Sequence, residues 1–486
     1  MKVRRIRAYR RRPSVLQRPV PRRWRTRLLP PVARTPQPKG LPTSWLRLRR
    51  LLWAWWVWAA VAVWALTDTR WSWFIGATAA AIVTHLGAPR ERAPVYGLDH
   101  DVAVEEPEFL ENVVGLTGFA FVGGNRVDLL HNGDAFYPAM LDAIASARIS
   151  VTIETYIYWH GAVGVTFARA LADRARVGVA VKILLDAIGS ATIGDEILQI
   201  LEDGGCQLAW FNPLRWQTVG SFNYRTHRKT LVVDGTVGFT GGAGLADHWA
   251  GHAQDPAHWR DTQVRLEGPA VTPLQTGFAQ NWLQTTGEVV CGPCFFPDVP
   301  RRGTLVVQTL LSSPSTGTSA ARLLYYLSIT CAQRTIEIAN PYFVPDKAAI
   351  DAFRDAHRRG VRIRIMVAGR HNDNWLARQN SVRLYGSLLD AGIELYEFTR
   401  TMLHQKTMTV DGQWATIGTT NFDARSFSFN QESNVSFVDP ELIVELDRAF
   451  EKDLRACERV THESWRRRAW WQRLTELGAS VFQEQT

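Results

Sequence analysis

The stretch HRKTLVVDG at residues 227–235 recurs as HQKTMTVDG at residues 404–412. Each copy places a histidine and a lysine two residues apart, and in a β-strand such residues point to the same face. The Asp-Gly pair near the end of each copy is typical of a hairpin turn, which predicts return strands at residues 236–240 and 413–417. We therefore expect two similar β-hairpins, each with a His and a Lys on one face.

The residue types in these motifs match the needs of displacement at a phosphodiester. A neutral imidazole can attack phosphorus and form a covalent intermediate while a second group protonates the departing alkoxide. Two histidines with pKa values near neutrality can divide these roles and exchange them in the second step. Two lysines place positive charge beside the oxygens that become more negative in the transition state. The candidate catalytic residues are His227, Lys229, Asp234, His404, Lys406 and Asp411.

A single motif of this kind would carry little weight. One His-x-Lys on a strand is usually an exposed polar face, and one Asp-Gly is usually only a turn. Two copies at equivalent places in a duplicated chain favour catalysis. For Asp234 and Asp411 a second interpretation stays open, because they could hold the turn or an ion pair without touching substrate. The chemistry requires no metal, and the sequence has no His/Cys/Asp cluster with ligand spacing, so we expect no cofactor.

The residues around the motifs repeat as well. The Ile-Glu pairs at 153–154 and 336–337 are offset by 183, and the motif histidines are offset by 177. A duplicated unit with small differences in loop length accounts for both offsets. Strands that alternate with helices predict mixed α/β halves. The matched segments are strands at 147–158 and 332–343, helices at 165–176 and 348–359, and apolar strands at 179–186 and 361–368.

The positive charge of the chain is concentrated at its N-terminus. Residues 1–50 contain 17 Lys and Arg and no Asp or Glu, and the rest of the chain has 39 basic against 46 acidic residues, a balance of −7. A nuclease is expected to carry basic patches on its catalytic body, so this balance argues against nucleic acid as a partner. The five scattered cysteines do not form a disulfide pattern, and we interpret them as reduced thiols in a protein that faces the cytosol.

Two uncharged apolar runs follow the basic segment, LLWAWWVWAAVAVWAL at 51–66 and WSWFIGATAAAIVTHL at 71–86. Each would form a helix of roughly 24 Å, slightly shorter than a hydrocarbon core of roughly 30 Å. Seven tryptophans in 23 residues favour a membrane hairpin over a buried helical pair. The 17 basic residues predict a cytoplasmic N-terminus, and the hairpin returns the chain to that side. We expect a multi-pass protein of the inner membrane whose catalytic body faces the cytoplasm, although a hairpin that dips without crossing would give the same placement.

The motifs and the phrases around them resemble the phospholipase D superfamily and, within it, the bacterial cardiolipin synthases. The resemblance covers roughly residues 110–475. Besides the two motifs it rests on Leu130-x-Asn132-Gly133, IETYIY at 153–158, LDAIGS at 185–190, WRDT at 259–262, NPYFVP at 340–345 and NQESN at 430–434.

The resemblance implies an α/β fold with two duplicated phospholipase D-like domains related by a pseudo-twofold axis, and both motifs at their interface. The predicted fold is thus a two-domain body preceded by an N-terminal transmembrane helical hairpin. The expected parts are a basic disordered tail at 1–44, a two-helix membrane anchor at 45–88, a first domain at 105–285 and a second domain at 305–475.

The resemblance also implies roles for individual residues. His227 would be the nucleophile, and His404 the general acid and then the general base. Asp261 and Glu432, each downstream of a motif, would hold the histidine of that motif, although ordinary surface carboxylates remain an alternative. The family often has Asn at the end of the Gly-rich stretch after each motif. Asn421 keeps it in the second copy, whereas the first copy has Gly244, so the halves are expected to be unequal.

The function that we expect is that of a cardiolipin synthase-type phosphatidyltransferase. It would join two phosphatidylglycerol molecules into cardiolipin and glycerol through a phosphatidyl-histidine intermediate, so that membrane phospholipids are its partners. The alternatives are a hydrolase of phospholipids, a nuclease and a membrane scaffold without catalysis. The acceptor lipid and the oligomeric state stay open. The segment WRRRAWWQR at 465–473 has the composition of a lipid-facing helix or of a helix that docks on the body.

Overall fold

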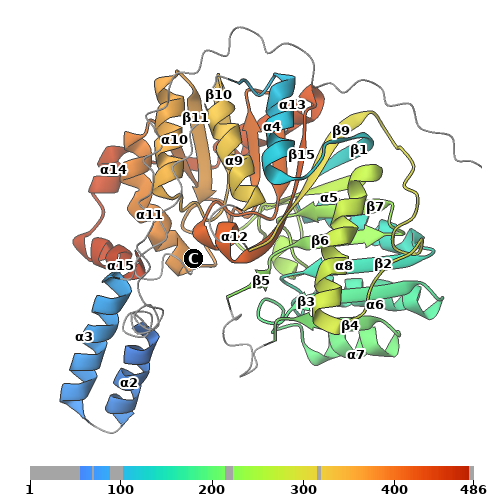
Figure 1. Cartoon of the computed structure of the whole chain (residues 1–486), viewed down its shortest axis with the longest axis horizontal. Coiled ribbons are helices and arrows are strands. Elements are labelled where there is room, and N and C mark those ends of the chain that lie inside the picture. The colour runs from blue at the N-terminus through green and yellow to red at the C-terminus, as the bar shows by residue number, and fades with distance from the viewer. Residues whose placement is uncertain (1–54, 68–69, 88–101, 214–222, 315–318, 481–486) are drawn as a thin grey trace, which may run out of the picture. The chain divides into compact units, whose positions relative to one another are not determined.

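The computed structural model divides the chain into two units, a small helical one and a large one that contains every described strand (Figure 1). The predicted basic tail at 1–44 and the first residues of the predicted anchor lie outside the described part of the chain. The described residues are 55–67, 70–87, 102–213, 223–314 and 319–480.

The small unit consists of two helices, α2 (Trp55–Thr67) and α3 (Trp71–Gly87), which pack against each other. The backbone N–H of Arg70 donates to the carbonyl of Ala65 at 2.9 Å in the connection between them. Both helices fall within the range 45–88 that was expected to form the anchor. Over the described residues of the chain, no helix combines the length and the apolar character needed to cross a membrane.

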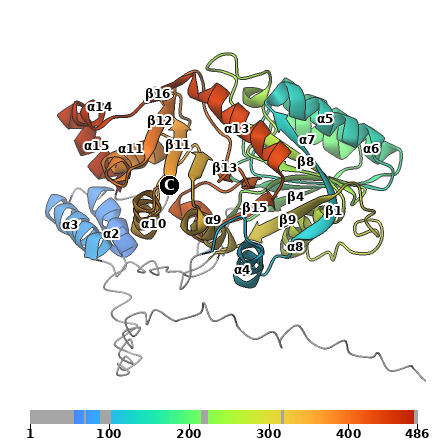
Figure 2. The same ribbon diagram turned by 90° about the horizontal axis from the view of Figure 1, so that it is seen from above.

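One continuous 16-stranded sheet forms the centre of the large unit, and its two halves repeat the same strand order outward from a central antiparallel pair (Figures 1 and 2). The first half runs β1 (Val122–His131), β8 (Thr262–Glu267), β7 (Val237–Gly241), β6 (Lys229–Val233), β2 (Ser150–Thr155), β3 (Ala180–Asp186) and β4 (Gln207–Phe211). The second half runs β9 (Leu305–Ser312), β15 (Asn430–Phe437), β14 (Trp414–Gly418), β13 (Thr407–Val410), β10 (Thr335–Ala339), β11 (Arg362–Ala368), β12 (Glu394–Phe398) and β16 (Cys457–Arg459). The short strand β5 (Arg225–Thr226) pairs with β15.

Helices cover both faces of the sheet, as β3 shows in the first half. Ile183 packs with the core that contains Phe136 and Phe167, whereas its neighbour Leu184 packs with Phe278. Successive strand residues point to opposite faces, so the apolar run at 183–185 in β3 must be buried on both sides. The helices of this half are α5 (Gly133–Ser146), α6 (Ala162–Arg176), α7 (Asp195–Asp203) and α8 (Thr272–Thr286). The mixed α/β fold predicted from the sequence is confirmed.

The second half has its own set of helices, together with one that comes from the start of the large unit. Helix α4 (Pro107–Thr117) falls within the range 105–285 expected for the first domain, but it packs with the second half. There, the ring of Phe109 lies edge-on to Trp414 at 5.8 Å. The other helices are α9 (Ala320–Cys331), α10 (Lys347–Arg358), α11 (Trp375–Asp390), α12 (Ala424–Ser428), α13 (Pro440–Leu454), α14 (His462–Arg466) and α15 (Trp470–Ser480).

The strand pairing corrects the alignment of the two copies. Val151 lies opposite the sixth residue after His227, and Ile336 lies opposite the sixth residue after His404. Strands β2 and β10 therefore correspond at an offset of 185. The two Ile-Glu pairs, which are offset by 183, do not occupy equivalent places in the sheet.

Candidate active site

Each motif histidine follows a short segment that runs along a strand of the opposite half. Strand β5, just before His227, pairs parallel with β15, and the backbone N–H of His227 donates to the carbonyl of Gln431 at 2.9 Å. The segment before His404 runs along the first half in the same way, and the backbone N–H of His404 donates to the carbonyl of Arg260 at 2.8 Å. Both motifs therefore meet where the two halves join.

The side chains of the histidines are also held from the opposite half. Nδ1 of His227 lies 3.0 Å from both carboxylate oxygens of Glu432, and Nδ1 of His404 lies 2.9 Å from Oδ2 of Asp261. The sequence expectation paired each acid with the histidine of its own motif, and the structure corrects this pairing. The pairs are crossed because each acid directly follows the residue whose carbonyl accepts the backbone hydrogen bond of the other motif's histidine.

The two acids are buried and held as anions. Burial by itself would raise the pKa of Asp261, but the hydrogen bond and charge of His404 lower it below its usual value. Burial would likewise raise the pKa of Glu432, and the charge and hydrogen bond of His227 lower it. Asp261 also accepts from the indole N–H of Trp249 at 2.9 Å, and Glu432 accepts from the hydroxyl of Thr419 at 2.5 Å.

These contacts determine which nitrogen of each histidine can react. A carboxylate beside Nδ1 holds a proton on that nitrogen and leaves the lone pair of Nε2 available. Burial lowers the pKa of His227 to about 4, and burial together with the charge of Lys406 lowers the pKa of His404. Both imidazoles are therefore neutral near pH 7 before an anionic substrate enters.

The two motif lysines lie beside the histidines. Nζ of Lys229 donates to the carbonyl of His227 at 3.0 Å, and Nζ of Lys406 lies 3.1 and 3.2 Å from the ring nitrogens of His404. Burial lowers the pKa of Lys229 to about 7, with the charge of Lys406 adding to the shift, and burial lowers the pKa of Lys406 to about 8. A phosphodiester anion placed here would stabilise both ammonium groups, so the site is suited to bind a single negative charge.

Aromatic rings border both histidines, and sequence reasoning did not select them. The ring of Tyr156 lies 5.4 Å from His227, and the rings of Trp249, Trp259 and Tyr342 lie 5.2, 5.5 and 6.3 Å from His404. Three of these rings lie within the quoted family phrases. Trp249 carried no repeat signal, because the residue 177 positions later is a serine.

The Gly-rich stretch after each motif explains the inequality of the halves. A Cβ on Gly242 would lie 2.3 Å from Oδ1 of Asp261, and a Cβ on Gly244 would lie 2.8 Å from Cβ of Ile157. The first half therefore has no room for a side chain where the second half has Asn421. Asn421 is buried, and its side-chain oxygen accepts no hydrogen bond from the residues that the structure describes.

The motif aspartates lie away from the histidines, which favours a structural role for them over a catalytic one. Both lie at the far ends of β6 and β13 with left-handed backbone, at φ 49° for Asp234 and 55° for Asp411. Asp234 accepts backbone N–H bonds from residues 148–150, and Asp411 accepts them from residues 333–335 at 2.7–2.8 Å. They connect the hairpin turn to the start of the neighbouring strand, which was the second interpretation left open by the sequence.

Replacing Asp411 with alanine should therefore reduce stability rather than chemistry. The change leaves three backbone N–H groups without their acceptor and places alanine at positive φ, so we expect a loss of about 2–4 kcal/mol in the free energy of unfolding. Asparagine tolerates this backbone and keeps one acceptor oxygen, so Asp411→Asn should lose less. Thermal denaturation and kcat of the folded fraction would be measured together. A large fall in kcat at unchanged stability would return Asp411 to the catalytic residues.

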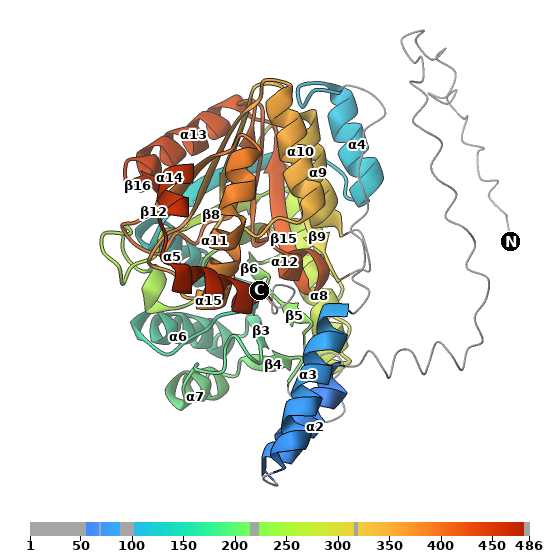
Figure 3. The same ribbon diagram turned by 90° about the vertical axis from the view of Figure 1, so that its left-hand side faces the viewer.

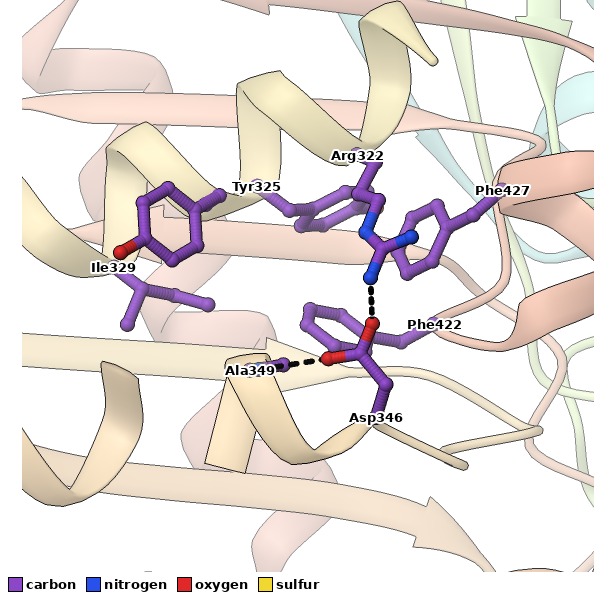
Figure 4. Close-up of a pocket in the computed structure, with 8 residues that line it drawn as sticks. Arg322, Tyr325, Ile329, Asp346, Ala349, Phe422 and Phe427 are labelled. Atoms are coloured by element: carbon purple, nitrogen blue, oxygen red, sulfur yellow. Dashed lines mark hydrogen bonds and ion pairs between the residues drawn. The ribbon is translucent and has the colours of Figure 1, made fainter. Parts of the chain in front are cut away.

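The second half also contains a small pocket whose lining includes no motif residue (Figure 4). Figure 4 shows Arg322 and Asp346 joined by an ion pair, with Asp346 also accepting from the backbone N–H of Ala349 at 2.8 Å at the start of α10. The pocket is lined by Arg322, Tyr325, Tyr326, Ile329, Asp346, Ala349, Phe422 and Phe427. Within the described ranges, no group of three or more His, Cys, Asp or Glu side chains is placed to hold a metal ion.

Comparison with a known crystal structure supports the fold. The phosphatidylserine synthase of Haemophilus influenzae superposes with a TM-score of 0.61 at 13% sequence identity, covering 78% of this chain and all of that one. At this identity the likeness concerns the fold alone.

Comparisons of sequence identify the family. The family model described as "Cardiolipin synthase, PLD-like domain" matches residues 140–257 and 327–454, one range in each half of the sheet. The cardiolipin synthase of Geobacillus kaustophilus is 33% identical over 355 residues, which is 72% of this chain and 70% of that protein. The major cardiolipin synthase ClsA of Bacillus subtilis is 32% identical over 359 residues, 73% of this chain and 74% of that protein. The chain therefore belongs to the cardiolipin synthase family, with two phospholipase D-like regions.

Proposed function

We propose that this protein is a phosphatidyltransferase that joins two phosphatidylglycerol molecules into cardiolipin and glycerol. Its relatives named cardiolipin synthase support this activity. The observation that carries the proposal is the pair of buried histidines, each with a carboxylate at Nδ1 and a lysine beside it. That arrangement supplies two groups that can exchange the roles of nucleophile and acid.

In the first step Nε2 of His227 attacks the phosphorus of one phosphatidylglycerol. A bond forms between nitrogen and phosphorus, and the bond from phosphorus to the oxygen of the glycerol headgroup breaks. His404, protonated once the phosphodiester anion is bound, gives its Nε2 proton to the departing glycerol oxygen. The products of this step are free glycerol and a phosphatidyl-histidine at His227.

In the second step the headgroup hydroxyl of another phosphatidylglycerol attacks the same phosphorus. Neutral His404 takes the hydroxyl proton, and the bond between phosphorus and His227 breaks to release cardiolipin. Lys229 and Lys406 stabilise the negative charge of the phosphoryl oxygens in both transition states. Glu432 and Asp261 keep the two rings in the required tautomer and orientation, so we propose them as positioning residues.

Product analysis tests the proposal directly. Full-length protein in vesicles would be given phosphatidylglycerol with isotope in its headgroup glycerol, and the lipids would be identified by mass spectrometry. We expect cardiolipin that retains one labelled glycerol, with one labelled glycerol released for each cardiolipin formed. Phosphatidic acid as the main product would identify a hydrolase instead. Adding unlabelled phosphatidylethanolamine tests the donor, because its use would release ethanolamine.

The buried lysines should make transfer sensitive to alkaline pH. In the free enzyme the pKa is about 7 for Lys229 and about 8 for Lys406, and each side chain loses its positive charge as pH rises through that value. We therefore expect kcat/KM to fall above neutral pH. A bound phosphodiester stabilises the ammonium forms, so the alkaline limb of kcat should lie at higher pH. Initial rates across the neutral and alkaline range measure both limbs, and a kcat/KM that is constant there would contradict the prediction.

The proposal includes a membrane anchor formed by α2 and α3. Val63, Trp64 and Ile75 are large apolar side chains that are exposed on these helices. A tethered site meets two lipid substrates at high effective concentration. The 17 basic residues before the hairpin favour a cytoplasmic location for both its ends, at the inner membrane. Full-length protein should stay in the membrane fraction after extraction at high pH, and its release would contradict the anchor.

A further inference from the structure

The C-terminal helix α15 is held against the rest of the large unit by one face. Glu476 and Ala479 are buried on this face, and Glu476 forms an ion pair with Arg468 at 2.7 Å. The hydroxyl of Thr475 lies 3.5 Å from Oε1 of Gln379 on α11. Figures 1 and 3 both show α15 beside α11. The composition of residues 465–473 left two alternatives open, a lipid-facing helix and a helix that docks on the body. The buried face of α15 accounts for the second.

The preceding helix α14 makes this attachment firm. The indole N–H of Trp465 donates to the carbonyl of Val382 on α11 at 2.9 Å. A Cβ on Gly386 would lie 2.5 Å from the Trp465 ring, so the ring packs closely against the backbone of α11. The guanidinium of Arg468 lies 4.0 Å from the centre of the same ring. Both α14 and α15 therefore pack on α11, and these contacts set the position of α15.

The opposite face of α15 is apolar and exposed. The exposed fractions are 72% for Trp470, 54% for Trp471, 58% for Leu474 and 65% for Leu477. Residues spaced three, four and seven apart lie on one side of a helix, so these four side chains form one surface. We call them the α15 apolar face. Single large apolar side chains are often exposed on a protein surface. Here four of them are exposed together, which is unusual.

Positive charge borders the α15 apolar face. Residues 462–480 contain four arginines and two glutamates, and both glutamates are ion-paired, with Arg467 and with Arg468. The excess positive charge therefore belongs to Arg466 and Arg473, which are both exposed. Trp and Leu on one side with Arg at the border is the pattern of a helix that lies in the interface of an anionic bilayer.

Helix α11 connects this surface to the candidate active site. Its first residue, Trp375, is 58% exposed, and Asp373, two residues earlier, accepts a hydrogen bond from the hydroxyl of Tyr342. The Tyr342 ring lies 6.3 Å from the ring of His404. One end of α11 thus lies beside the reacting groups, while its length supports α14 and α15.

We infer that the α15 apolar face docks on the surface of a bilayer that contains anionic phospholipid, and so orients the catalytic unit toward the lipid headgroups. The occupant is a lipid surface rather than a protein, because the bordering charge is complementary to anionic headgroups. This binding does not depend on the reaction that the histidines perform. It is separate from the α2–α3 anchor, since α15 belongs to the large unit.

Photo-crosslinking in the full-length protein tests the inference without using activity. The photoreactive amino acid p-benzoylphenylalanine would replace Leu477, and in a matched control it would replace Val177, which is 67% exposed at the end of α6. Both proteins would be irradiated in vesicles of phosphatidylcholine with increasing labelled phosphatidylglycerol. We expect a lipid adduct at position 477 several-fold above that at 177, and an increase with the phosphatidylglycerol fraction. Equal labelling, or adducts to a second copy of the chain or to the α2–α3 hairpin, would overturn the inference.

Kinetics give a second and independent readout. The triple variant Trp471→Ser, Leu474→Ser and Leu477→Ser should raise the KM for phosphatidylglycerol in vesicles several-fold. Its rate with a short-chain, water-soluble phosphatidylglycerol should equal that of the wild type. The control is a triple serine variant at three exposed apolar positions elsewhere, Leu116, Val177 and Val289. An unchanged vesicle KM, or an equal rise in the control, would contradict the inference, whereas wild-type protein that makes no cardiolipin would contradict only the proposed function.

Discussion

Replacing His227 with alanine should lower phosphatidyl transfer by about 10⁴-fold or more and abolish the covalent intermediate, because the change removes the nitrogen that is proposed to attack phosphorus. Replacing His404 should lower transfer by roughly 10²–10⁴-fold, because both steps lose their proton donor or acceptor. The two expected ranges meet at about 10⁴-fold, so the overall rates alone do not distinguish the roles.

An activated substrate separates the two histidines. A phosphatidyl ester of p-nitrophenol has a leaving group that departs without protonation, so His404→Ala should still form the intermediate and release nitrophenolate in a burst. The intermediate should then accumulate, because attack by the second lipid lacks its general base. His227→Ala should give neither burst nor adduct. The burst would be followed by absorbance and the adduct by intact mass at high pH, where phospho-histidine survives.

The control is His160→Ala, at an exposed histidine that pairs with Glu196 away from the motifs. It should retain the wild-type burst and turnover. A burst in His227→Ala but not in His404→Ala would exchange the assigned roles. An unimpaired rate in either variant would contradict the mechanism altogether.

The second large effect is expected at the two acids, and it should follow the crossed pairing. Asp261→Asn should reproduce the behaviour of His404→Ala, although Asp261 follows the first motif in the chain. Glu432→Gln should reproduce that of His227→Ala. An amide in place of the carboxylate can donate to Nδ1, which moves the ring proton to Nε2, the nitrogen that must react. A comparable exchange in serine proteases costs about 10⁴-fold in kcat, so we expect roughly 10³–10⁴-fold here.

The burst assay with the activated substrate measures this directly. Asp261→Asn should form and accumulate the intermediate, and Glu432→Gln should fail to form it. The matched control is Glu337→Gln, at a largely buried carboxylate that pairs with Arg364 and touches neither histidine. The crossed pairing would be contradicted if each acid affected the histidine of its own motif. Asp261→Asn would then block formation of the intermediate.

The local structure around each motif was predictable because its causes lie in neighbouring residues. Alternation in a strand puts His227 and Lys229 on one face, and the Asp-Gly pair forces a turn by its backbone preference. The same local features make Asp234 and Asp411 candidates but do not decide their role. Whether an aspartate contacts substrate or a strand terminus depends on which strand lies beside it, and this is a property of sheet order.

The sequence by itself determined the duplicated α/β unit, the four motif residues that lie together and the apolar hairpin ahead of the body. Only the tertiary structure decided that Glu432 serves His227 and that Asp261 serves His404, across separations of 205 and 143 residues. It also decided that burial keeps the histidines neutral and lowers the pKa values of both lysines. The physical reason is that periodicity and turn preference act within a few residues, whereas pairing and desolvation depend on which strands the fold brings side by side.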